Sequence, residues 1–76
     1  MPVSSIAKVA VTSAVRTATQ MAPVATKTVA KTTAKTIAKQ AVSEVVKAAP
    51  NITVKQTNKI LTSSYKLILK AIKVRK

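Results

Sequence analysis

The chain has 76 residues, of which 14 are Lys or Arg and only one, Glu44, is acidic, so its net charge is +13. A compact monomer would concentrate this charge and has nothing to neutralise it, so we expect an external polyanion or anionic surface to supply the counter-charge. With no His, Cys or Asp the chain lacks the side chains for a disulfide, a zinc site or a catalytic triad, and we predict a non-enzyme without metal or cofactor.

The absence of glycine predicts an all-α fold, because glycine serves the tight turns that a many-stranded β protein needs. We predict amphipathic helices over about 5–21, 24–48 and 57–74, broken at Pro23 and Pro50, within one small domain spanning 1–76. Much of the apolar content is Ala and Val, which bury little area per residue. We therefore expect order to come from an oligomeric array or from the bound polyanion.

The first helix is predicted over 5–21, where Ser4 or Ser5 can act as its cap. At helical spacing one half of it is apolar, and Lys8 and Arg16 lie in the other half. The apolar half consists of Ile6, Ala7, Ala10, Val11, Ala14, Val15, Ala18 and Met21.

The second helix, over 24–48, is expected to carry Pro23 at its first position and to end before Pro50. A continuous rod that is only kinked at Pro23 is the alternative. The predicted buried seam runs along Ala30, Ala34, Ile37, Ala41, Val45 and Ala48, and its mostly small side chains would allow a neighbouring helix to approach closely.

A four-residue repeat within this helix places a lysine at each step: Lys27, Lys31, Lys35 and Lys39. Like charges four residues apart destabilise an isolated helix by roughly 0.2 to 0.5 kcal/mol per pair, and phosphates along the stripe would reverse that effect. A solvated lysine face is the alternative, which the lack of nearby acids disfavours. In composition, residues 27–39 are similar to linker-histone tails and to small core proteins of DNA viruses.

Residues 49–56 are expected to form an extended linker, and Thr57 or Asn58 to cap the last helix, over 57–74. Asn51 begins a tripeptide that matches the glycosylation acceptor pattern, but such tripeptides are common by chance. An Asn at this position is more often a turn or cap residue. The last helix is predicted to place its apolar and basic side chains on opposite sides. The apolar set is Ile60, Leu61, Tyr65, Leu67, Ile68, Ala71 and Ile72, and the basic set is Lys59, Lys66, Lys70 and Lys73.

These patterns predict a structural protein that coats or compacts duplex DNA without sequence preference, through contacts between lysines and phosphates. Single-strand binding is disfavoured because Tyr65 is the only aromatic residue. The predicted nucleic-acid-binding residues are Lys8, Arg16, Lys27, Lys31, Lys35, Lys39, Lys47, Lys59, Lys66, Lys70 and Lys73.

A virion coat or core protein, or a nucleoid protein, is the expected setting, with the chain forming a homo-oligomer. The alternatives are an amphipathic protein that binds membrane surfaces and a small basic subunit of a ribonucleoprotein. Lys8 interrupts the apolar stretch over 6–11, so we expect no secretory signal, and no apolar run reaches the length of a membrane span. The sequence leaves open whether the helices form a bundle, a hairpin or a kinked rod.

Overall fold

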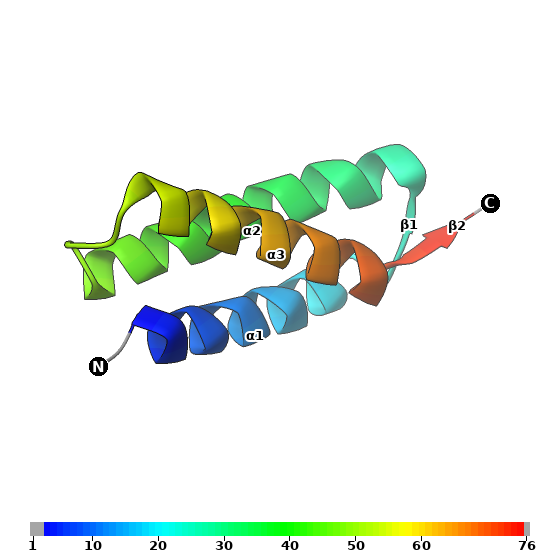
Figure 1. Cartoon of the computed structure of the whole chain (residues 1–76). Coiled ribbons are helices and arrows are strands. Elements are labelled where there is room, and N and C mark those ends of the chain that lie inside the picture. Colours follow the sequence, from blue (N-terminus) through cyan, green and yellow to red (C-terminus); the bar gives the residue numbers. More distant parts are fainter. Residues whose placement is uncertain (1–2, 76) are drawn as a thin grey trace.

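The computed structural model describes residues 3–75, which form three helices and a short two-stranded sheet. The order is α1 (Val3–Met21), β1 (Val24–Thr26), α2 (Lys27–Ala48), α3 (Val54–Ala71) and β2 (Lys73–Arg75). Figure 1 shows α1 and α3 running in the same direction, with α2 running the opposite way beside them. The predicted all-α fold is confirmed, and among the arrangements left open it is a bundle, with dimensions of 41 × 19 × 15 Å.

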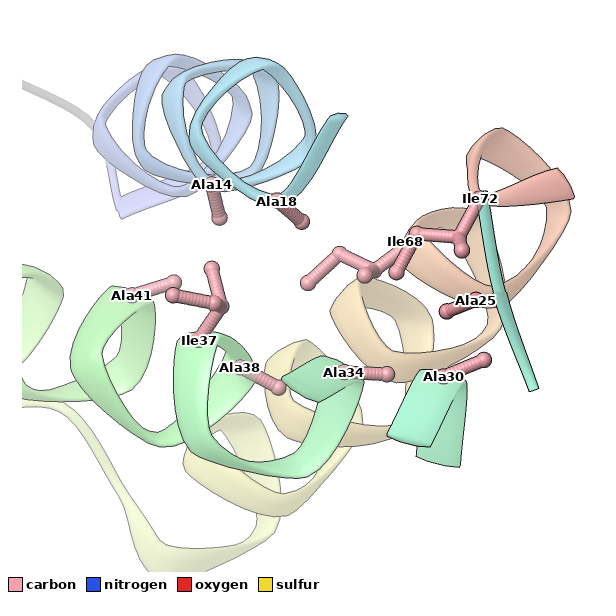
Figure 2. Close-up of a cluster of buried hydrophobic side chains, with 10 residues drawn as sticks. All are labelled: Ala14, Ala18, Ala25, Ala30, Ala34, Ile37, Ala38, Ala41, Ile68 and Ile72. Carbon is pink, nitrogen blue, oxygen red and sulfur yellow. The ribbon is translucent and has the colours of Figure 1, made fainter. Parts of the chain in front are cut away.

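Alanine dominates the core where the three helices meet. Ile37 and Ile68 supply the larger side chains and point from α2 and α3 into the space beside Ala14 and Ala18 of α1 (Figure 2). Because most side chains at the contact are small, the helices can pack with their axes near the close end of the usual range of about 8–10 Å. The apolar faces thus share one core within a single chain.

Most of the residues predicted on the apolar faces are buried or half-buried, with exceptions at the helix ends and on one flank of α3. Of the seam predicted for α2, all but Ala48 are buried. Met21 and Leu67 were expected on apolar faces, yet 68% and 46% of their surfaces are exposed. Met21 is the last residue of α1, and Leu67 lies at the edge of the buried stripe of α3. Ser64, in contrast, is fully buried.

The start of α2 differs from the prediction, because Val24–Thr26 is a strand and Pro23 is not a helical residue. The Thr26 hydroxyl accepts a hydrogen bond from the amide of Val29 at 3.2 Å and caps the helix. The helix is thus interrupted between α1 and α2. A continuous rod that is only kinked at Pro23 is excluded, since α1 and α2 pack antiparallel.

The C-terminal end of α3 also differs from the prediction, because here too a short strand replaces the expected helical turn. The helix ends at Ala71 instead of 74, and Lys73–Arg75 pairs in parallel with β1, with Val24 opposite Lys73 and Thr26 opposite Arg75. The amide of Lys73 also donates to the carbonyl of Pro23 at 3.2 Å. This short sheet ties the end of α3 to the start of α2 at one end of the bundle (Figure 1).

The prediction of a linker over 49–56 was wrong at its C-terminal end. Thr53 caps α3, with its hydroxyl accepting from the amide of Gln56 and the Gln56 side-chain oxygen accepting from the amide of Thr53, both at 3.2 Å. This reciprocal capping box starts the helix at Val54, so Thr57 and Asn58 are helical residues and not caps. The turn between α2 and α3 therefore contains only residues 49–53.

Candidate nucleic-acid interface

A row of lysines covers the outer side of α3. Lys55, Lys59, Lys66 and Lys70 are all exposed, and we call them the α3 lysine row. At about 100° per residue they fall within an arc of about 60°, opposite the buried Ser64 and Ile68. The apolar side of α3 is thus used inside the bundle, and its outer side presents ammonium groups.

A second row lies on α2 and consists of Lys31, Lys35 and Lys39, which we call the α2 lysine row. All three are exposed, and each step of four residues rises about 6 Å and turns about 40°. The sequence repeat thus becomes a gently drifting line of positive charge along one flank of the helix. The hydroxyl of Thr32, between two of these lysines, donates to the carbonyl of Thr28 at 3.0 Å.

The flank of α2 that carries this row is the one next to α3. Gln40 and Glu44 line the groove that α2 forms with α1, so they mark the α1-facing flank. The α2 lysine row lies on the other side of the buried line through Ala34 and Ala38, by the same angular count. The α2 lysine row therefore lies on the flank of α2 next to α3, and the α3 lysine row follows on the outer side of α3, so the two rows are neighbours around the bundle.

The groove between α1 and α2, which we call the α1–α2 groove, is poor in charge. Ile6, Val9 and Ala10 line its α1 side, and Lys47 is the only cation in its lining. Glu44, the single acid of the chain, lies in the same groove. This surface therefore carries compensating charges, in contrast to the two lysine rows.

The remaining predicted site residues lie apart from the two rows. Lys8 and Arg16 are exposed on the outer side of α1, where they border a shallow depression. Lys27 is the first residue of α2, Lys73 is in β2, and both are exposed. The structure thus sorts the predicted residues into two rows on neighbouring helices and several scattered cations.

Lys55 is a member of the α3 lysine row that the sequence interpretation omitted, because it was placed in the linker. The signal that would have found it is the Thr-x-x-Gln spacing of Thr53 and Gln56, which moves the helix start upstream. Lys55 then falls four residues before Lys59 and extends the row by one turn.

Two further features bear on the predicted chemistry. Within residues 3–75, no cluster of three or more side chains suited to metal binding occurs, and no helix of that region has the length and hydropathy to cross a bilayer. Comparison of the chain with models of protein families, with curated proteins and with solved structures finds no match.

Proposed function

We propose that the protein binds duplex DNA without sequence preference, through contacts of its lysines with the phosphate backbone, and coats or compacts the DNA. The observation that carries this proposal is the pair of neighbouring lysine rows on α2 and α3, with the only acid of the chain in the α1–α2 groove. A lysine contact with phosphate holds a protein to the backbone and carries no sequence information. A virion or a nucleoid is the setting that suits such a coat.

The same arrangement favours a nucleic acid over a membrane surface. An interfacial helix buries its apolar side in lipid, but the corresponding residue Ile68 of α3 is fully buried in the bundle. Membrane binding by this helix would first require the bundle to open. The side of α3 that faces outward is cationic, and it is better suited to phosphates than to acyl chains.

We further propose that copies of the chain assemble through the α1–α2 groove. Two chains that each carry +13 repel one another across most of their surfaces. In the groove, Glu44 offsets Lys47, and the exposed Val9 offers apolar area for contact. A second copy is the occupant that this charge balance favours, because two strongly cationic chains repel one another least at a surface whose own charges cancel.

Thermal unfolding in the presence of random-sequence duplex DNA tests the proposal. A ligand at about 100 to 1,000 times its dissociation constant stabilises the folded state by about 2.7 to 4.1 kcal/mol. For a domain of this size that corresponds to an increase in Tm of roughly 10 to 30 °C. Dextran at equal mass is the uncharged control, and vesicles of anionic lipid are the membrane arm. A rise in Tm with vesicles and none with duplex DNA would favour the membrane function instead.

A further inference from the structure

The two lysine rows are level with one another along the bundle. At one end Val24 pairs with Lys73, and at the other the turn over 49–53 joins Ala48 to Val54. Since α2 and α3 are antiparallel and rise equally per residue, residues at the same level have numbers that add up to about 100. By this count the level pairs are Lys31 with Lys70, Lys35 with Lys66, and Lys39 with Lys59.

The spacing of these pairs suits two chains of phosphates. Packed helices have axes about 8–10 Å apart, the outward-pointing rows lie somewhat further apart than the axes, and successive levels are about 6 Å apart or more. A B-form duplex carries its phosphates on two strands that border grooves about 6 and 12 Å wide. Two parallel rows of mobile ammonium groups at this separation can reach both strands beside one groove.

We propose that α2 and α3 form a duplex-binding face, on which each lysine row contacts one of the two phosphate strands that border a single groove. The inference rests on the proposed function and adds where the DNA lies and why a duplex is preferred. A single strand offers only one chain of phosphates and can engage one row at a time. It also gains no stacking platform, because Tyr65 is partly buried against the core.

The duplex-binding face lies on one side of the bundle only, so it limits how many duplexes one subunit can hold. The α1–α2 groove contains one cation and the one acid, and the outer side of α1 carries only Lys8 and Arg16, so neither presents a second pair of lysine rows. Each subunit therefore holds one duplex segment on its α2–α3 side and leaves the groove for a neighbouring subunit. The expected result is a coat along one duplex, in which single subunits do not bridge two duplexes.

Three triple variants with equal loss of charge test this face. The α2-row variant replaces Lys31, Lys35 and Lys39 with Gln, and the α3-row variant replaces Lys59, Lys66 and Lys70 with Gln. The control replaces with Gln the residues Lys8, Arg16 and Lys73, which are exposed but belong to neither row nor to the α1–α2 groove. For each, the affinity for a random-sequence duplex and for one of its strands is measured against salt concentration. Circular dichroism verifies that the helices are retained, and versions with Arg at the six row positions keep the charge.

On the duplex, each row variant should reduce the magnitude of the slope of log affinity against log salt by about 2.7, and the control by less than about 1. The Arg versions should retain the slope. On the single strand, either row variant should change the slope by less than about 1, because the other row remains. A control variant that loses as much as the row variants would overturn the proposal, as would a duplex slope that depends on only one row. If the unaltered protein shows a duplex slope near zero, the proposed function itself fails.

Discussion

The affinity for duplex DNA is expected to fall about a thousandfold when monovalent salt is raised from about 50 to 200 mM. The six lysines that form level pairs on α2 and α3 would displace about six condensed counterions, which gives a slope of log affinity against log salt of about −5. Fluorescence anisotropy with a labelled random-sequence duplex measures this directly.

The control for this titration is base composition. Duplexes rich in A·T and in G·C pairs should give the same slope and affinities within a few fold, because lysine contacts with phosphates do not report the bases. A slope shallower than about −2 would contradict the account, and so would an affinity that depends strongly on sequence.

Replacement of Ile68 with Ala is expected to destabilise the bundle severely. Ile68 is fully buried and is one of only three isoleucines in the core cluster, where most other side chains are alanines. Truncation of a buried isoleucine costs about 2–5 kcal/mol, and a domain of this size has a total stability of only about 4–11 kcal/mol. The variant should lose at least about 10 °C in Tm, measured by circular dichroism at 222 nm.

Leu67 provides the matched control, since it is the preceding residue of α3 and 46% of its surface is exposed. The change of Leu67 to Ala leaves no closed cavity and should cost less than about 1 kcal/mol. Equal losses of Tm in the two variants would mean that Ile68 does not lie in a packed core.

The helices were predictable because they depend on a local pattern. In α2 the spacing of Ala30, Ala34, Ile37, Ala41 and Val45 indicates one buried line, and all five are buried. The start of α3 was also present in the sequence, in the Thr53–Gln56 capping box. It was missed because the alternation over 52–55 resembles an extended segment.

The two strands could not be predicted in the same way. Val24–Thr26 directly follows a proline and has no local feature that separates it from a first helical turn. Its extended conformation depends on pairing with Lys73–Arg75, which lies nearly fifty residues later in the chain. Pairing over such a separation is a property of the folded bundle and not of either segment.

The candidate site was likewise predictable only as far as it depends on local sequence pattern. Composition pointed to the lysines as candidate binding residues, and the four-residue repeat predicted the α2 lysine row. The α2 lysine row lies next to α3 because the opposite flank of α2 packs against α1. It is level with the α3 lysine row because the turn over 49–53 is short. Those two facts are set by tertiary packing, so sequence periodicity alone could not separate Lys35 from Lys8 or Lys47.

The phosphorus content of the assembly isolated at low salt from its natural source tests most directly whether phosphate chains neutralise this protein. We predict many copies of the chain per DNA molecule, with DNA phosphate in an amount comparable to the 13 net positive charges of each chain. An assembly that contains no nucleic acid, with the lysines of α2 and α3 facing water, would contradict the account.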